Sequence, residues 1–158
     1  MLSMTKRADY ALLALSYLAS QSVDDPQRLV NTKEIAEQFE LPVELLAKLL
    51  QILAKNGLVA SHPGPTGGYR LLRDPKKISV AQVVALIDGP LSMLHCSNGQ
   101  ESSCKQFNHC TIRDPLAEIE ERVRALLDNI SIAEISVPVT PVFEDFSHRR
   151  FAAGIPVA

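Results

Sequence analysis

The sequence contains no tryptophan, and aromatic residues of all kinds make up only 5% of its 158 positions. Because apolar residues still account for 46% of the chain, we expect a core of aliphatic helices. No stretch approaches the roughly 18 consecutive apolar residues of a membrane-spanning helix, so no membrane partner is expected. Charged residues stand near the N-terminus where a signal peptide has its apolar region, which predicts a cytoplasmic location.

Cysteine is also scarce, but its three copies, Cys96, Cys104 and Cys110, all lie within fifteen consecutive residues. An odd number of thiols excludes complete pairing within one chain. In the cytoplasm, clustered cysteines bind metals or serve redox chemistry more often than they form structural disulfides. The surrounding segment is polar, so burial in an apolar core does not explain these thiols. We therefore expect them to bind a ligand.

The spacing of the cysteines, with seven residues in the first gap and five in the second, discriminates between metals. Thiolates bind zinc and iron–sulfur clusters, whereas structural zinc sites usually contain cysteine pairs that are closer together. The spacing therefore favours an iron–sulfur cluster. Two alternatives stay open: a zinc site completed by His95 or His109, and a metal-free thiol sensor.

Two helices are predicted in the first forty residues. The first covers residues 5–20, which are rich in strong helix formers, and Thr5 is its expected cap. A polar loop is predicted over residues 21–31. Thr32 is the expected cap of a second, shorter helix, which ends at Leu41-Pro42 because the residue before proline disfavours helical geometry.

A longer helix is predicted over residues 43–55, ended by Asn56-Gly57. The sequence of short helix, tight turn and longer helix is that of a helix-turn-helix module. Two strands then follow, over residues 58–62 and 69–73, joined by a turn rich in glycine and proline. A β-hairpin directly after a helix-turn-helix predicts a wing.

Ser79 is the expected cap of a further helix over residues 80–88, and Asp114-Pro115 marks the start of a long one. The rest of this long helix is charged, apart from apolar residues at alternating spacings of three and four. A single apolar seam of this heptad type indicates packing against a partner helix. The seam residues are Leu116, Ile119, Val123, Leu126 and Ile130.

The predicted fold is mainly α with a small β-hairpin wing, a winged helix-turn-helix plus a long helix that packs against a partner helix. It divides into a DNA-binding domain over residues 1–90 and a cluster-binding loop over residues 91–113. The helix region over residues 114–136 follows, and the family resemblance described below implies that it is a dimerisation helix. The remaining residues, 137–158, are expected to form a partly disordered tail.

The charge distribution makes the first half of the chain the better candidate for an anionic partner. Residues 1–77 carry ten Lys and Arg against eight Asp and Glu, while residues 78–158 carry six against ten. In a helix-turn-helix module, the start of the second helix enters the major groove. The side chains expected at base edges are Glu44, Ala47, Lys48 and Gln51. Those expected at phosphates or groove edges are Lys6, Arg7, His62, Thr66, Arg70, Arg73, Lys76 and Lys77.

Several stretches together resemble the Rrf2 family of bacterial iron–sulfur transcriptional regulators, whose members include IscR-like and NsrR-like proteins. The resemblance covers about residues 1–136, and the ordered set is far more specific than any one of its pieces. The matching stretches are residues 5–12, 53–59, 64–70, the cysteine segment and residues 130–135.

The resemblance implies a winged-helix homodimer in which Cys96, Cys104 and Cys110 bind an iron–sulfur cluster and the helix from Asp114 mediates dimerisation. It also bears on Asp9. From spacing alone, Asp9 is interpreted as an exposed acid favoured by the helix dipole. The resemblance to NsrR-like members implies instead that Asp9 is a cluster ligand supplied by the partner chain.

This sequence departs from the family pattern in three places. IscR-like members have a histidine ligand three residues after the third cysteine, where this chain has Arg113. Asp9, His95 and His109 are therefore the candidates for the fourth ligand. The first cysteine gap exceeds the five residues of IscR and NsrR. A wing arginine of IscR is replaced by Pro63, so the DNA sequence preference is not transferred.

The sequence as a whole predicts a homodimeric regulator that binds double-stranded operator DNA and senses redox state, nitric oxide or iron–sulfur supply. Three cysteines and one oxygen ligand favour a 4Fe–4S cluster over a 2Fe–2S cluster. The alternatives are a zinc-based or thiol-based regulator with the same fold and, in another class, an iron–sulfur carrier or interaction subunit. No nucleophile–base pattern or phosphate-binding loop is present, so we do not expect an enzyme.

Overall fold

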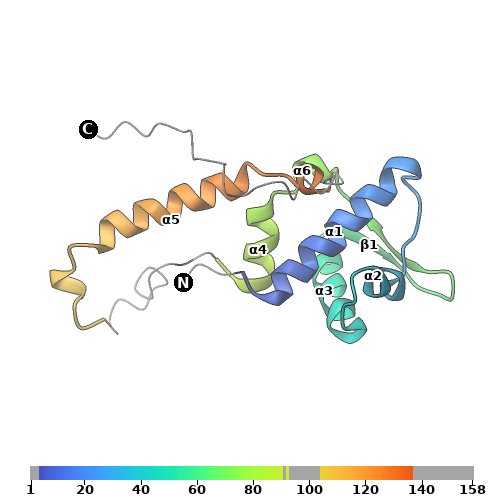
Figure 1. The fold of residues 1–158 in the computed structure, drawn as a ribbon, viewed down its shortest axis with the longest axis horizontal. Helices are drawn as coiled ribbons and strands as arrows, with labels where there is room; N and C mark the ends of the chain where they lie inside the picture. Colours follow the sequence, from blue (N-terminus) through green and yellow to red (C-terminus); the bar gives the residue numbers. More distant parts are fainter. Residues whose placement is uncertain (1–3, 91, 93–103, 137–158) are drawn as a thin grey trace, which may run out of the picture.

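A computed structural model describes residues 4–90, 92 and 104–136 of the chain. The described part is mostly helical and contains one two-stranded antiparallel sheet, which confirms the predicted fold class (Figure 1). His95 and Cys96, and the tail over residues 137–158, lie outside the described residues. The elements are α1 (Lys6–Asp24), α2 (Thr32–Gln38), α3 (Val43–Lys55), β1 (Val59–His62), β2 (Gly68–Leu71), η1 (Pro75–Lys77), α4 (Val80–Asp88), η4 (Phe107–His109), α5 (Arg113–Asp128) and α6 (Ile132–Ile135).

The first two helices follow the prediction with two corrections. Thr5 caps α1 as expected, since its hydroxyl accepts a hydrogen bond from the Ala8 amide. The helix continues to Asp24, so the expectation of a loop from residue 21 was wrong; the helix ends directly before Asp25-Pro26, because the residue before proline disfavours helical geometry. The cap of α2 is Asn31 rather than Thr32, since the Asn31 side chain accepts from the Glu34 amide at 2.8 Å.

The turn between α2 and α3 brings the two helices of the predicted helix-turn-helix together. Glu40 occupies this turn with φ of 53°, a left-handed conformation that L-residues other than asparagine and aspartate seldom adopt. Pro42 then precedes α3, as expected for a proline at a helix start. The helix buries Leu46, Leu49, Leu50 and Leu53.

The hairpin after α3 pairs Val59 with Leu71 and His62 with Gly68. The returning strand ends at Leu71, two residues earlier than predicted. The Leu72 amide still donates to the Leu58 carbonyl oxygen at 3.0 Å, but Leu72 and Arg73 lie beyond the paired strand and are exposed. Gly68 is required by a close approach, because a Cβ atom at this position would lie 2.5 Å from the Val30 carbonyl oxygen. Val30 thereby forms a bridge with Tyr69, which joins the loop before α2 to the wing.

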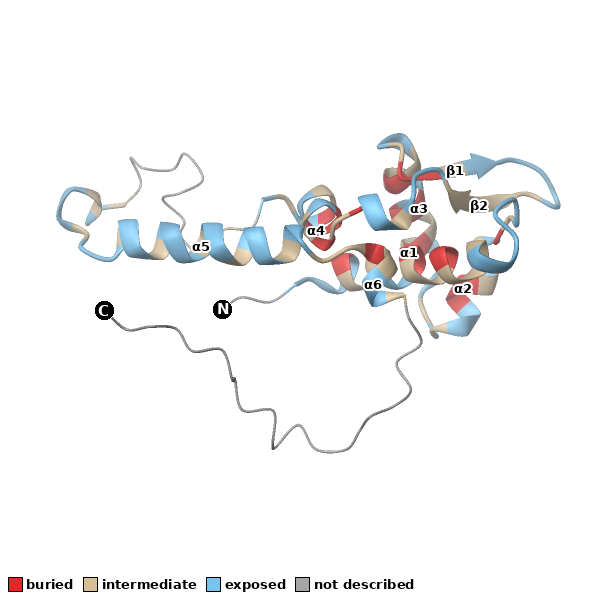
Figure 2. Ribbon diagram, turned by 90° about the horizontal axis from the view of Figure 1, so that it is seen from above, coloured by how far each residue is buried: buried red, intermediate tan, exposed pale blue. Residues whose placement is uncertain are grey.

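Helix α4 packs against α1, is capped by Ser79 as predicted, and buries Val80, Val83, Val84 and Ile87. Together with α1, α2, α3, the start of β1 and α6 it forms the aliphatic core, and no polar side chain of the described part is buried. Figure 2 shows the buried residues concentrated in this winged body, meaning α1–α4, the hairpin and α6.

Helix α5 extends away from the winged body, and none of its residues is buried (Figures 1 and 2). It begins at Arg113, and its cap position is Ile112. Asp114, which the sequence predicts as the cap, instead lies in the first turn, so the helix starts two residues earlier than predicted. At its other end, α5 is fixed to the body by the hydrogen bond from the Ser79 hydroxyl to Asp128 at 2.6 Å.

The short α6 was not predicted as a separate helix. It starts with a capping box in which the Ser131 hydroxyl accepts from the Glu134 amide, while the Glu134 carboxylate accepts from the Ser131 amide. The hydrogen bond to Ser131 holds the pKa of Glu134 below its usual range. Ile132, which is fully buried, anchors α6 in the core beside α1.

Candidate nucleic-acid interface and thiol segment

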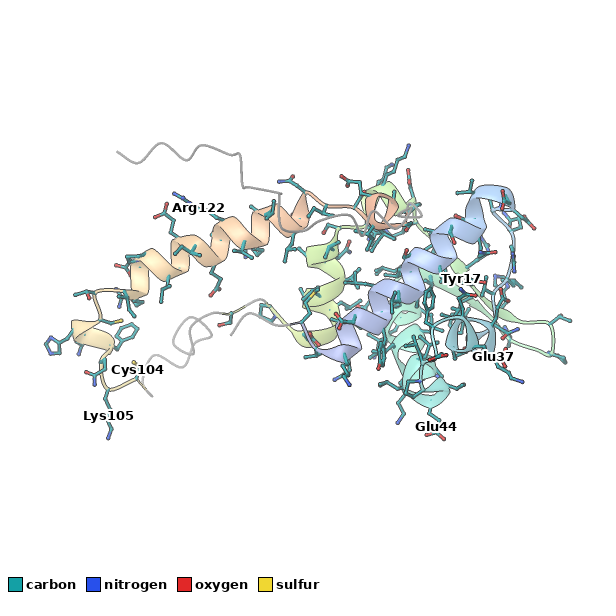
Figure 3. The ribbon with its side chains drawn as sticks, in the orientation of Figure 1. Tyr17, Glu37, Glu44, Cys104, Lys105 and Arg122 are labelled. Carbon is teal, nitrogen blue, oxygen red and sulfur yellow. The ribbon has the colours of Figure 1, made fainter. Side chains whose placement is uncertain are left out.

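The start of α3 presents a polar face to solvent. Glu44, Lys48 and Gln51 are exposed and lie four and three residues apart, which places them on one side of the helix. Ala47 is half-buried beside them. The apolar side is turned inward, with Leu46, Leu49 and Leu50 in the core. Figure 3 shows Glu44 directed away from the body at the free end of α3.

The wing brings two of its predicted site residues together. The Arg70 Nε–H group donates to His62 Nε2 at 3.4 Å across the hairpin, so an imidazole and a guanidinium share one side of the wing. Arg70 is half-buried, whereas His62 and Thr66 are exposed. Arg73 is exposed just beyond the second strand. Exposed cationic and polar groups on a hairpin beside α3 are suited to contacts with phosphates.

The first turn of α1 carries three of the predicted site residues. Lys6 and Arg7 are exposed, and Asp9 is half-buried. The Asp9 amide donates to the Thr5 carbonyl oxygen at 3.1 Å, as a regular helical turn requires. Lys76 and Lys77, in η1 after the second strand of the wing, are also exposed.

Cys104 and Cys110 flank the short helix η4 at the far end of α5. Both are free, half-buried thiols in the described part of the chain. The Phe107 amide donates to the Cys104 carbonyl oxygen at 3.1 Å, so the backbone turns directly after the first of these thiols. His109, at the end of η4, is exposed. We call residues 104–112 the thiol segment.

Arg113 fastens the thiol segment to α5. Its guanidinium lies 4.7 Å from the centre of the Phe107 ring, a cation–π contact that joins η4 to the first residue of α5. It also pairs with Asp114 at 2.7 Å, and this hydrogen bond lowers the pKa of the Asp114 carboxyl. The residue at the position of a family histidine ligand thus packs on an aromatic ring between two cysteines.

The donor chemistry of the thiol segment fits an iron–sulfur cluster or zinc, because both bind thiolates and both thiols here are unpaired and partly accessible. Within the described ranges, however, no three Cys, His, Asp or Glu side chains are close enough to hold a metal. Asp9 is in the first turn of α1, and the start of this helix lies far from the thiol segment in both views (Figures 1 and 2). A single chain therefore does not bring Asp9 to Cys104 and Cys110.

Two contacts near these sites were missed from the sequence. The Phe107–Arg113 stack had a signal, since Phe107 is the one aromatic residue in the polar cysteine segment. The hydrogen bonds between Thr5 and Asp88 had none, because these residues are 83 positions apart. No helix in the described part of the chain is both long and apolar enough to cross a membrane.

Comparison with known proteins shows the family. Residues 4–137 match the family model Rrf2, described as an iron-dependent transcriptional regulator. The chain is 32% identical over 149 residues to an Rrf2-like HTH-type transcriptional regulator of Rhodobacter capsulatus, covering 90% of this chain and 99% of that protein. It is 34% identical over 132 residues to the HTH-type transcriptional regulator IscR of Yersinia pestis, covering 84% and 77%.

Solved structures give the same fold. IscR of T. potens matches with a TM-score of 0.62 and 26% identity over 85% of each chain. CymR of Staphylococcus aureus matches with a TM-score of 0.65 and 26% identity, over 85% of this chain and 98% of that one. These relatives are regulators and not enzymes, which confirms that expectation. The chain belongs to the Rrf2 family and is a winged-helix transcriptional regulator.

Proposed function

We propose that this chain is a cytoplasmic homodimer that binds operator DNA and senses redox state, nitric oxide or iron–sulfur supply through an iron–sulfur cluster. The observation that carries the proposal is the position of the thiol segment. It lies at the outer end of a helix in which no residue is fully buried, and the opposite end of that helix is fixed to the DNA-binding body by the Ser79–Asp128 hydrogen bond and by Leu127, which packs against the core.

For DNA binding, the exposed face of α3 supplies groups of suitable chemistry. Lys48 and Gln51 can donate hydrogen bonds to base edges or phosphates, while Glu44 can accept from a cytosine amino group. Arg70 and Arg73 on and after the wing, with Lys6 and Arg7 on α1, are the proposed phosphate contacts. All of these except Arg70 are exposed.

For dimerisation, the seam of α5 supplies the contact surface. Ile119 is 45% exposed and Leu126 is 62% exposed, so removing these apolar side chains from water would be favourable. Between α4 and α5 lies a groove of about 340 Å³, lined by Ala81, Val84, Ala85 and Pro90 together with the polar side chains of Gln82, Arg124 and Asp128. A second copy of the chain, packing its seam against this one, would cover these surfaces.

For cluster binding, Cys96, Cys104 and Cys110 are the proposed ligands. When bound, the cluster supplies a redox-active and oxidant-sensitive group. We propose that Asp9 of the partner subunit completes the shell, since Asp9 does not approach the thiol segment of its own chain. His95 and His109 are the fallback ligands. With one oxygen ligand, we favour a 4Fe–4S cluster over a 2Fe–2S cluster.

The test is anaerobic purification followed by iron and acid-labile sulfide analysis, with gel shifts on genomic fragments before and after cluster removal. We expect iron and sulfide in the wild-type chain and specific DNA binding whose affinity differs between the two forms. Asp9→Ala should change the visible absorption spectrum, whereas Asp24→Ala, at the other end of α1, should not. A colourless chain without sulfide would contradict the proposal, and an unchanged Asp9→Ala spectrum would remove Asp9 from the ligand set.

The second candidate is a thiol-based regulator with the same fold. It is favoured by the partly exposed, free thiols of Cys104 and Cys110, and the related CymR of S. aureus has also been solved in an oxidized form. In this case the anaerobic chain contains neither iron nor sulfide. Its DNA affinity then changes on treatment with peroxide and returns with a thiol reductant.

A further inference from the structure

The carboxylate of Asp88, the last residue of α4, holds the cap residue of α1 by two hydrogen bonds. The Thr5 hydroxyl donates to Asp88 Oδ1 at 2.6 Å, and the Thr5 amide donates to Oδ2 at 3.1 Å. The same hydroxyl oxygen accepts from the Ala8 amide at 3.3 Å. One residue therefore both caps α1 and joins it to α4. We call this pair of bonds the Asp88–Thr5 clamp.

The clamp connects two regions that the proposed function requires to communicate. On one side, the first turn of α1 carries Lys6 and Arg7, which are exposed, and Asp9. On the other side, Asp88 ends α4, and the chain leaves the helix through Gly89, whose φ is 88°. Cys96 follows eight positions after Asp88 in the sequence.

The opposite end of α4 is joined to α5. The Ser79 hydroxyl donates to Asp128 Oδ1 at 2.6 Å while its oxygen caps α4, and the Val80 amide donates to the Ile130 carbonyl oxygen at 2.8 Å. Both ends of α4 thus use a hydroxyl and a carboxylate to attach a neighbouring helix. A short helix that is fixed at both ends moves with its attachments rather than independently of them.

We propose that Asp88 is a positioning residue: through it, binding or loss of the cluster in the cysteine-bearing part of the chain changes the position of the first turn of α1. Two bonds from one carboxylate fix the orientation of this turn as well as its distance from α4. A displacement of the end of α4 therefore either moves Thr5 with it or breaks both bonds. This inference rests on the proposed function, since it requires cluster-dependent DNA binding.

The test compares DNA affinity of the full chain with and without its cluster, by fluorescence anisotropy on the same operator. For the wild type we expect the affinities of the two forms to differ about tenfold or more, within the usual range of allosteric coupling. Asp88→Ala should reduce this difference to about twofold or less. Asp88→Asn, which keeps the side-chain shape but only one acceptor oxygen, should give an intermediate difference.

Two further variants separate coupling from a general loss of structure. Thr5→Ser retains both donors and should keep the wild-type difference between the two forms. Asp24→Ala removes a carboxylate from the other end of the same helix and should also keep it. Hydrogen exchange of the cluster-free chain should show faster exchange at residues 5–9 in Asp88→Ala but not in Asp24→Ala.

The outcomes distinguish the inference from the function on which it rests. If the wild type responds to cluster loss and Asp88→Ala responds equally, the inference is wrong and the proposed function stands. If exchange at residues 5–9 is unchanged in Asp88→Ala, the clamp does not hold α1, which also overturns the inference. If the wild type has equal affinity in both forms, the proposed function fails, and the inference fails with it.

Discussion

The winged body and α5 differ in how each is stabilised. All buried apolar residues of the described chain belong to the body, where four helices, the hairpin and α6 enclose one aliphatic core. Helix α5 has no buried residue and is held at one end by polar contacts and by Leu127, which packs against the core, while Ile119 and Leu126 on its seam are exposed. The body is therefore expected to fold on its own contacts, whereas α5 requires a further surface to cover its seam.

The largest effect should come from the core of the body. Leu50→Ala removes a fully buried side chain of α3 and should lower the free energy of unfolding by about 3 kcal/mol. The matched control is Leu126→Ala on α5, where 62% of the residue is exposed. At concentrations where the chain is monomeric, this control should change the unfolding free energy by less than about 0.5 kcal/mol. Urea unfolding followed by circular dichroism measures both, and equal losses would contradict the distinction between the two regions.

The next effect should appear in assembly rather than in folding. Ile119→Glu places a charge in the seam of α5 and should weaken dimerisation by about 2 kcal/mol, because a carboxylate in an apolar interface lacks a partner. Ala117→Glu adds the same charge to the opposite face of the helix and should leave the dimer intact. Sedimentation equilibrium distinguishes them. If Ala117→Glu were as disruptive as Ile119→Glu, the seam would not be the interface.

A smaller effect is expected at the DNA-facing side of the body. Lys48→Ala should weaken operator binding by about 1 kcal/mol and reduce the slope of affinity against salt by about one ion if Lys48 contacts a phosphate. A base contact would instead relax the sequence preference. Lys55→Ala, at the other end of α3, is the control. Operator DNA is titrated with each variant at several salt concentrations. If the affinity and the salt slope of Lys48→Ala match those of Lys55→Ala, Lys48 lies outside the interface.

The smallest effect concerns the junction between the two regions. The hydrogen bonds from Ser131 lower the pKa of Glu134, so the folded chain favours its ionised form. This contribution to stability is fully present above the ordinary glutamate pKa of about 4.3 and is lost as pH falls below that value and through the lowered one. Glu134→Gln should remove this part of the acid sensitivity. The measurement is the urea midpoint of the wild type and of Glu134→Gln at several pH values above and below the ordinary glutamate pKa. If the two midpoints fall in parallel with pH, the capping box contributes nothing to the acid sensitivity of folding.

The two regions also differ in how far their structure could be predicted from sequence. The helix-turn-helix and the wing were predicted because helix periodicity, Asn56-Gly57 and the glycine-rich turn are local signals. The choice between two adjacent residues that can both cap a helix was harder to predict: Thr32 was expected to cap α2, and Asn31 does so. The seam of α5 was also visible, but its exposure was not, since that depends on which elements the rest of the chain places beside it.

The candidate site was predictable in chemistry but not in geometry. Three clustered cysteines indicate a ligand whatever their fold, and Arg113 could be recognised as a departure from the family histidine. That Arg113 stacks on Phe107, and that Asp88 holds Thr5, depends on contacts that only the folded chain creates. The place of Asp9 in a shared shell depends on a second chain, which the sequence of one chain does not position.

The most direct test of the central claim is native mass spectrometry of the full chain purified without oxygen, because one spectrum counts protomers, irons and inorganic sulfides. The account predicts a dimer that carries iron and sulfide in equal numbers on each protomer and loses both when Cys104 and Cys110 are replaced by serine. A chain with neither iron nor sulfide in its anaerobic form would contradict it.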